Sequence, residues 1–223
     1  MIIKYVLLTI LMVVFSSQME MIRASEGFLR NSSELIAQLS KKQKLFNQKI
    51  AALKSDCMDE MNLSSERSLS EISEELIDGE LPTDSFQIVM QRADALITCK
   101  APKKAQKILQ SINPETVPQK REWSLLLWKA SNASMDHFNA SLALRSLSSG
   151  VLERLDDEEI TVGSLSDGST LTRTALDLLA EHERLSGRCE ESAKVLLAGR
   201  KSGSLGAVRI SRAVQCLEGL EIE

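Results

Sequence analysis

Residues 178–197 read LLAEHERLSGRCEESAKVLL, with an apolar residue every three or four positions on either side of Gly187. This period is typical of two amphipathic helices, and glycine is favoured in the short turn that would join them. We therefore predict a helical hairpin here, and we expect its one histidine and one cysteine to be structural rather than catalytic.

The composition of the whole chain favours helices throughout. Of its 223 residues 43% are apolar and 4% are aromatic, and only four prolines and ten glycines interrupt the chain. Leucine and alanine are the commonest apolar residues, whereas alternating runs rich in Val, Ile, Thr and Tyr are missing. The net charge of −4 provides no strong basic field, so we do not expect binding to nucleic acid.

The helical period recurs from residue 84 almost to the end of the chain. It predicts seven helices, at residues 85–99, 100–113, 121–134, 136–149, 171–186, 189–199 and 206–220. Loops of two to five residues inside the pairs would make neighbouring helices antiparallel. Residues 151–170 break the pattern, and we predict a polar insertion there.

The predicted helices are similar to one another at a fixed offset of 34 residues. Val89 then falls on Trp123, and Leu176 falls on Ile210. Between the second and third pairs the offset is 53, which leaves room for the insertion. A hairpin cannot bury its apolar face alone, so repeated hairpins must stack on one another. The last helix, with Arg209 and Arg212 among its apolar residues, is predicted to be a polar-faced cap.

The clearest repeat carries apolar and small residues at characteristic spacings around one turn glycine. These are Leu176, Leu179, Ala180, Gly187, Cys189, Ser192, Ala193 and Leu196. This pattern resembles the tetratricopeptide family of helical repeats over residues 84–219, about 60% of the chain. Leu96, Ala130 and Glu183 depart from it, because each occupies a position at which the family carries tyrosine. The expected fold is all-α, a tetratricopeptide-like α-solenoid of stacked antiparallel hairpins preceded by a long N-terminal helix, with a generic hairpin stack as the alternative.

The first residues predict a targeting segment. Lys4 precedes an unbroken apolar stretch from Tyr5 to Phe15, which ends at two serines. A membrane-spanning helix needs about 20 apolar residues, so a cleavable export signal is favoured over an uncleaved anchor or a buried helix. The expected segments are a signal peptide or anchor at 1–17, a helical segment at 18–81 and the repeat domain at 82–223.

The segment before the repeats has the spacing of a coiled-coil seam. Its members are Ile36, Leu39, Gln43, Phe46, Ile50, Leu53 and Cys57. We expect residues 20–58 to self-associate or to dock on the stack. The lysines among them would form a solvated face, with contact to an anionic membrane as the weaker interpretation.

The four cysteines do not have metal-ligand spacing. If the chain is exported, their even number permits two disulfides. Cys189 begins one predicted helix and Cys216 lies in the second half of the next. These ends lie side by side in a stack, so we predict that these two cysteines pair. Cys57 with Cys99 is the remaining pair.

The sequence lacks the residue patterns of known catalytic, cofactor-binding and metal sites. Ser186 stands where a metalloprotease helix around His182 would need its second histidine, and His137 is expected at the surface. The run of acidic residues at 156–159 lacks the order of a calcium loop, and residues 199–206 lack that of a phosphate loop. We therefore expect no cofactor, no metal and no enzyme activity.

The resemblance implies a concave groove lined by the first helix of each pair. Carried over to this chain, the groove would be formed by Met90, Asp94, Ile97, Ser124, Trp128, Ser131, Asp177, Glu181 and Arg184. Trp128 lies about 140° around its helix from Trp123, so it is expected to leave the core and anchor a peptide. The alternative is that Trp128 packs under the N-terminal helices.

These observations predict a non-catalytic scaffold that binds a protein or peptide partner. It would be exported to a periplasm or lumen, or tethered to a membrane by its N-terminal segment. The alternative is a structural subunit of an envelope or lumenal assembly, organised by the coiled-coil segment.

Overall fold

The computed structural model describes the chain in several ranges: residues 37, 38, 40, 41, 43–55, 57, 85–165, 167–200 and 202–218. The chain divides into two compact units, residues 1–49 and 50–223. The residues described in the first unit are helical. Ile36 and Leu39 of the predicted coiled-coil seam lie outside the described residues, as do residues 1–17 and the predicted boundary near residue 82.

Within the ranges that the structure describes, no helix is both long and apolar enough to cross a membrane.

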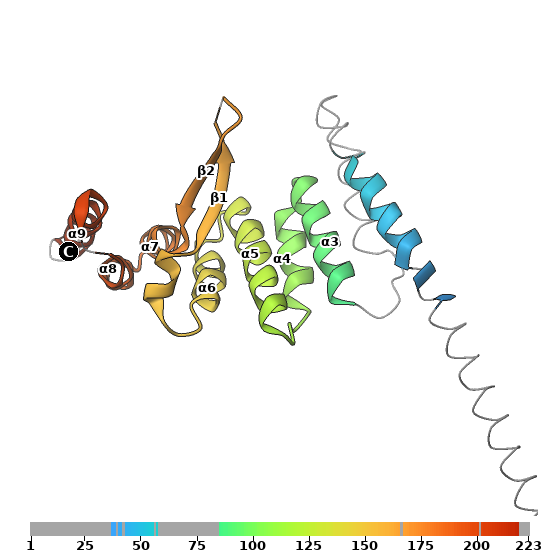
Figure 1. Ribbon diagram of the computed structural model, residues 1–223, viewed down its shortest axis with the longest axis horizontal. Coiled ribbons are helices and arrows are strands. Elements are labelled where there is room, and N and C mark those ends of the chain that lie inside the picture. The colour runs from blue at the N-terminus through green and yellow to red at the C-terminus, as the bar shows by residue number, and fades with distance from the viewer. Residues whose placement is uncertain are drawn as a thin grey trace, which may run out of the picture. The chain divides into compact units, whose positions relative to one another are not determined.

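The second unit is mostly helical, with one small β-hairpin (Figure 1). Its elements are α3 (Phe86–Thr98), α4 (Pro102–Gln110), α5 (Val117–Ala133), α6 (His137–Leu147), the 3-10 helix η1 (Leu152–Asp156), β1 (Glu159–Ser164), β2 (Thr170–Thr174), α7 (Ala175–Leu185), α8 (Cys189–Ala198) and α9 (Gly203–Glu218). The predicted helices are therefore present, with their ends moved by a few residues.

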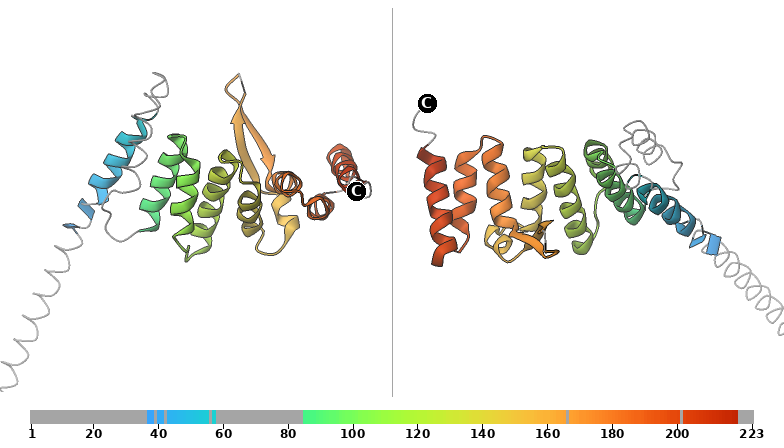
Figure 2. Two further views of the ribbon diagram at one scale, coloured as in Figure 1. Left: turned by 180° about the vertical axis from the view of Figure 1, so that it is seen from behind. Right: turned by 90° about the horizontal axis from the view of Figure 1, so that it is seen from above.

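Consecutive helices pack against one another, and α3 to α9 form a row (Figure 2). Short turns connect them, and the residue that follows the C-cap of a helix often has a left-handed backbone conformation. Gly187 has φ 75° after α7, and Lys100, Met135 and Ser149 have φ 54°, 60° and 49° after α3, α5 and α6. Glycine has this conformation in two of the four turns, at Gly187 and at Gly150, which follows Ser149 with φ 87°, so glycine does not mark the turns after α3 and α5.

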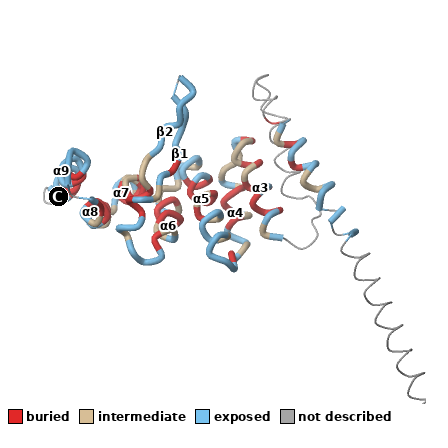
Figure 3. The backbone as a smooth tube through the Cα atoms, viewed as in Figure 1, coloured by how far each residue is buried: buried red, intermediate tan, exposed pale blue. Residues whose placement is uncertain are grey.

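The core lies between the helices and consists of leucine, alanine and other aliphatic side chains (Figure 3). Leu96, Leu109, Leu144, Leu176, Leu179 and Val195 are among its fully buried members. Each helix presents small residues to its neighbours as well, such as Ala105 on α4 and Ala193 on α8. This pairing of large and small side chains lets the helices approach closely along the row.

The predicted polar insertion is instead an ordered antiparallel hairpin, and its second strand occupies residues that we assigned to a helix. Glu159 pairs with Thr174 and Ser164 with Thr170, with an irregularity at Thr161 and Gly163. β-branched residues favour this pleated conformation and weaken the helix prediction at 170–174. Thr174 then caps α7 by accepting the backbone N–H of Asp177 at 3.1 Å.

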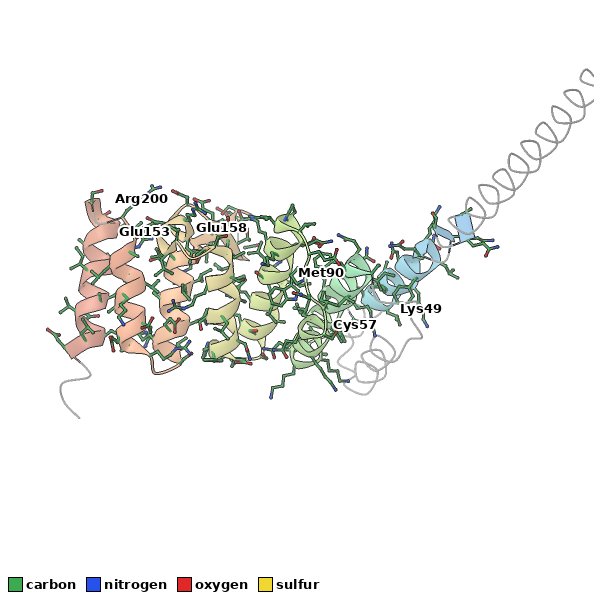
Figure 4. The ribbon with its side chains drawn as sticks, turned by 90° about the horizontal axis from the view of Figure 1, so that it is seen from below. Lys49, Cys57, Met90, Glu153, Glu158 and Arg200 are labelled. Carbon is green, nitrogen blue, oxygen red and sulfur yellow. A yellow bond between two sulfur atoms is a disulfide. The ribbon has the colours of Figure 1, made fainter. Side chains whose placement is uncertain are left out.

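Ion pairs attach the insertion to the helices beside it. Arg121 at the start of α5 pairs with Glu158, and Arg200 after α8 pairs with Asp157. Glu158 and Arg200 lie along the same edge of the row of helices in Figure 4. The hairpin itself is largely exposed beyond this edge, with Ile160 as its buried apolar residue.

Residues 50–57 belong to the same unit as the stack. A disulfide joins Cys57 to Cys99 at the end of α3, with 5.2 Å between the two Cα atoms. Lys54 forms an ion pair with Asp94 on α3, and Ile50 is buried. The segment before α3 is thus fixed covalently to the first helix of the row.

Helix α9 is only in part the polar-faced cap that we expected. Arg209 points inward and is only 1% exposed. Its Nε donates to Asp177 Oδ1 at 2.9 Å, and its Nη2 donates to Asp156 Oδ1 at 2.6 Å. Its exposed residues include polar ones, such as Arg212 and Glu218, and apolar ones, such as Ile210 and Val214. A buried arginine between two carboxylates therefore fastens α9 to α7 and η1.

Gly199 makes room for this arginine. A Cβ atom at position 199 would lie 2.6 Å from Nη1 of Arg209 and 3.1 Å from Cδ2 of Leu176. The first distance is too short for a real contact and the second is unusually tight, and Asp156 and Asp177 hold the guanidinium so that it cannot move away. The turn between α8 and α9 consequently requires glycine for close approach.

We expect Arg209→Met to lower the free energy of unfolding by about 3–5 kcal/mol at neutral pH, because it leaves two buried carboxylates without their partner. The measurement is urea denaturation followed by circular dichroism. Arg212→Met, on the exposed side of the same helix, is the control and should change the stability by less than about 0.5 kcal/mol. Equal losses in the two variants would show that the buried network does not stabilise the stack.

Candidate functional site

An open groove lies between α7 and α9, with α8 as its floor. Its volume is about 900 Å³. The side chains that line it are Arg173, Asp177, Ala180, Glu181, Arg184, Gly187, Cys189, Ser192, Leu196, Leu205, Val208, Arg209, Arg212, Gln215 and Cys216. The α7 members recur at spacings of three and four, so they form one face of that helix. The α9 members do the same, and the groove therefore has two helical walls.

Covalent and ionic contacts fix both halves of the groove. Asp177 accepts two hydrogen bonds from Arg209, which joins the early part of α7 to the middle of α9. The disulfide between Cys189 and Cys216 joins the start of α8 to the end of α9, with 5.2 Å between the two Cα atoms. This is the pairing that the repeat geometry predicts. These contacts fix the positions of α7, α8 and α9 relative to one another.

The two carboxylates around Arg209 remain ionised at neutral pH. The hydrogen bond from Arg209 holds the pKa of Asp156 below its usual value, although burial opposes this. Burial also opposes ionisation of Asp177, but hydrogen bonds from Arg209 and Thr174 outweigh it and lower that pKa too. The charged groups of this network are therefore paired with one another and are not free to bind a ligand.

Two arginines in the groove have no such match. Arg184 and Arg212 are exposed, and no carboxylate among the described residues pairs with either of them. Arg173 is paired with Glu181 at 2.5 Å. Arg184 lies seven residues after Asp177, and Arg212 three residues after Arg209, so both lie toward the disulfide end. This half of the groove carries an excess positive charge.

Apolar side chains line the rest of the groove, and Val208 lies about one helical turn before Arg212. Leu205 and Val208 on α9 are exposed and line the groove, and Leu196 contributes to its floor. A groove of this kind offers a ligand both apolar contact and directed hydrogen bonds from guanidinium groups. It therefore suits a segment that carries carboxylates next to apolar residues.

The predicted groove residues are divided between two places. Asp177, Glu181 and Arg184 line the α7–α9 groove. Met90 and Asp94 line a second, smaller groove of about 490 Å³ between α3 and α5. Asp94 is already paired there with Lys54, and Ile97 is half-buried outside either groove.

The middle of the predicted groove is closed. Ser124 and Ser131 are buried, and Trp128 is only 3% exposed. Trp128 therefore does not anchor a ligand, contrary to the expectation that it leaves the core. The rotation of 140° from Trp123 does not reach solvent, because α5 lies inside the row and has neighbours on more than one side. Trp123 uses its own indole N–H to donate to the Leu109 carbonyl oxygen at 2.8 Å.

Trp128 and His182 form part of a buried hydrogen-bond chain. The indole Nε1 of Trp128 donates to Nε2 of His182 at 3.1 Å. Since an indole N–H can only donate, the proton of His182 is on Nδ1. That atom is 3.1 Å from Nδ1 of His137, which accepts. Burial, and secondarily His137, lower the pKa of His182 to about 4, so the His182 ring serves as a neutral link between helices.

A second buried network, around Glu183, was not predicted from the sequence. Glu183 is fully buried, and its two oxygens accept from Nε of Arg145 at 2.7 Å and from Nε of Arg188 at 2.6 Å. Arg188 also donates to Ser141 Oγ at 2.6 Å. The sequence contains one indication of this network. Glu183 is charged, whereas the tetratricopeptide family carries an aromatic residue at the corresponding position. Its role is to join α6, α7 and the start of α8.

The described part of the chain holds no group of three or more His, Cys, Asp or Glu side chains that could bind a metal ion. No known protein family matches the chain, and no curated protein and no solved structure was found to be similar to it. The α7–α9 groove, with its unmatched arginines, is thus the feature from which a function can be argued.

We expect the stability of the protein to fall as the pH decreases from 6.5 to 4. His182 titrates near pH 6.5 when unfolded and near pH 4 when folded, so the unfolded state binds more protons across this window. The stabilisation is complete above pH 6.5, and at most about 3 kcal/mol of it is lost by pH 4.

The variant His182→Gln tests this contribution, because an amide oxygen can still accept from Trp128 but does not titrate. Urea midpoints measured from pH 7 to pH 4 should decline less steeply for the variant than for the unsubstituted protein. Parallel curves would contradict the assignment of the acid sensitivity to His182.

Proposed function

We propose that this protein is a non-catalytic interaction scaffold whose α7–α9 groove binds an acidic segment of a partner protein. The observation that carries the proposal is the pair of exposed arginines, Arg184 and Arg212, without carboxylate partners among the described residues. Charge-assisted hydrogen bonds from arginine to carboxylate are directional and about twice as strong as neutral ones. A partner segment with at least two carboxylates would satisfy both groups.

The stack supports this role by its rigidity. The Arg209 network and the Cys189–Cys216 disulfide hold the groove open without a ligand. Binding to a preformed site loses less conformational entropy than binding to a site that must first order itself. The exposed arginines can therefore bind an extended or helical segment with little loss of conformational entropy in the protein.

The row of consecutively packed helices also favours the tetratricopeptide-like interpretation. In that interpretation α3 with α4, α5 with α6 and α7 with α8 are repeats, and α9 is an additional helix that completes the last groove. The hairpin of β1 and β2 is then an insertion between the second and third repeats. Helical repeats of this kind provide extended binding surfaces rather than catalytic sites.

We further propose that the protein works in an oxidising compartment, either exported or tethered to a membrane. Two disulfides, Cys57–Cys99 and Cys189–Cys216, join its helices. Disulfides persist in periplasmic, lumenal and extracellular proteins and are rare in the cytosol. The predicted signal or anchor at residues 1–17 agrees with this location.

The binding proposal can be tested with a fluorescently labelled peptide in which glutamates flank two leucines, and with its glutamine counterpart. Fluorescence anisotropy should show that the glutamate peptide binds about tenfold or more tightly. Arg184→Gln with Arg212→Gln should remove this difference, because no other cation in this half of the groove lacks an internal partner.

Arg154→Gln with Lys120→Gln is the matched control, since it removes two exposed positive charges outside the groove. It should leave the preference for the glutamate peptide unchanged. If both double variants weaken binding equally, the peptide responds to net charge and the groove is not its site.

A further inference from the structure

Helix α9 carries an exposed apolar stripe in addition to its buried face. The buried face consists of Gly206, Arg209, Ala213 and Cys216. The stripe follows at steps of three, four and three residues, the spacing of a coiled-coil seam, and consists of Ala207, Ile210, Val214 and Leu217. All four of these residues are exposed, and the three larger ones have exposed fractions of 42%, 46% and 40%. The stripe is therefore not part of the core.

The stripe also lies apart from the α7–α9 groove. Successive residues of a helix are rotated by about 100°, which places the centre of the stripe about 100° from the centre of the buried face. Leu205, Val208 and Arg212 line the groove, and they lie about 100° from the buried face in the opposite direction. Helix α9 thus has one face toward the stack, one toward the groove and a third, apolar face that neither of them uses.

The place of α9 in the row explains why this face is apolar. Each earlier first helix packs against a second helix, as α3 does against α4, α5 against α6 and α7 against α8. Helix α9 lies at the end of the described row, in the place of another first helix, and no described helix covers its stripe (Figure 2). Terminal repeats of a stack usually turn a polar face outward, so the exposed stripe indicates a face that another helix covers.

The sizes of the side chains along the stripe make it complementary to itself. In an antiparallel pair of α9 helices with a two-fold axis near residue 212, Ala207 lies opposite Leu217 of the second copy. Ile210 then lies opposite Val214 of the second copy, so each layer combines a larger with a smaller side chain. A parallel pair would place Ala207 against Ala207 and Leu217 against Leu217, which leaves a gap at one end. Self-complementarity of this kind is what a two-fold symmetric interface requires.

The charges of α9 favour the same orientation. Its first turn contains no acidic residue, whereas Glu218 is exposed at its other end. In the antiparallel pair Glu218 lies beside Ser204 of the second copy, in the first turn, where the backbone N–H groups of a helix attract negative charge. A parallel pair would instead bring two Glu218 side chains together. Size and charge therefore both select a second copy of this chain in the antiparallel orientation.

We propose that the protein forms a two-fold symmetric dimer through the Ala207–Ile210–Val214–Leu217 stripe, in which α9 of each copy serves as the missing second helix of the other. The Arg209 network and the Cys189–Cys216 disulfide already hold α9 in place, so pairing does not have to order it first. The groove lies on the other side of α9. Each copy thus keeps its groove open, and the dimer does not depend on the ligand proposed for it.

The test is cross-linking of the full chain with a short bismaleimide, which reacts with an introduced thiol because the native cysteines are paired. Ser204 and Ser211 are both exposed on α9. The variant Ser211→Cys should give a cross-linked dimer, since residue 211 lies beside its own counterpart next to the two-fold axis. Ser204→Cys should not, because its two copies are about 20 Å apart along the helix axis. A monofunctional maleimide should label both thiols, which checks that both are accessible.

Two further substitutions, each made in the Ser211→Cys chain, test the stripe itself. Val214→Glu should reduce the cross-linked dimer several-fold, because the pair would bury an unpaired carboxylate. Leu142→Glu on α6 is the matched control, since Leu142 is 47% exposed and Val214 46%, and it should leave the yield unchanged. Circular dichroism checks that both variants are folded.

Three results would overturn the proposal. Equal cross-linking of Ser204→Cys and Ser211→Cys would indicate a parallel pair. A yield from Ser211→Cys that survives Val214→Glu would place the contact between copies elsewhere, for example in the N-terminal segment. No cross-linked dimer from an accessible Ser211→Cys thiol would show that the stripe is covered by another segment or by a different protein.

Discussion

The buried contact of Arg209 with Asp156 and Asp177 is the constraint on which the C-terminal half of the molecule depends. It connects residues from three elements, α9, η1 and α7, that are up to 53 positions apart in the sequence. A terminal helix has neighbours on one side only and therefore buries less apolar surface than an inner one. Directed ionic contacts compensate for this, and they also fix the rotation of α9 about its axis. The closeness of Gly199 to the guanidinium shows how tightly the contact is enclosed.

The position of α9 in turn determines the groove. With Arg209 facing inward, the next turn of the helix brings Arg212 to the wall opposite Arg184. Leu205 and Val208 fall on the same wall, so the charged and apolar features of the groove follow from a single rotation. The disulfide from Cys189 to Cys216 holds the far end, where no ionic contact is present among the groove residues. One end of the site is thus held by charge and the other by a covalent bond.

The period of the apolar residues was sufficient to predict the helices and their order. It also predicted which ends of the last helices meet, and hence the pairing of Cys189 with Cys216. It could not predict the hairpin at 159–174, because a short stretch of alternating β-branched residues also fits the beginning of a helix. Nor could it decide whether Trp128 is buried. That depends on how many neighbours surround α5, and such long-range packing leaves no local pattern in a single sequence.

The polar interior was the least predictable part of the molecule. Glu183, Arg209 and His182 look like surface residues by type, yet each is buried with partners from other helices. Their partners, such as Arg145 and Asp156, are 38 and 53 residues away, so no spacing rule connects them. Each network joins neighbouring elements of the stack and thereby specifies a single arrangement of helices whose apolar faces are otherwise alike. The buried charges are thereby paired, whereas Arg184 and Arg212 at the surface of the groove pair with no described carboxylate.

These two arginines lie on one side of the stack. Helix α8 is the floor of the α7–α9 groove, so the groove opens on the side of the first helices of each pair. The alternation of helices that buries the core thus leaves the facing sides of α7 and α9 open above α8.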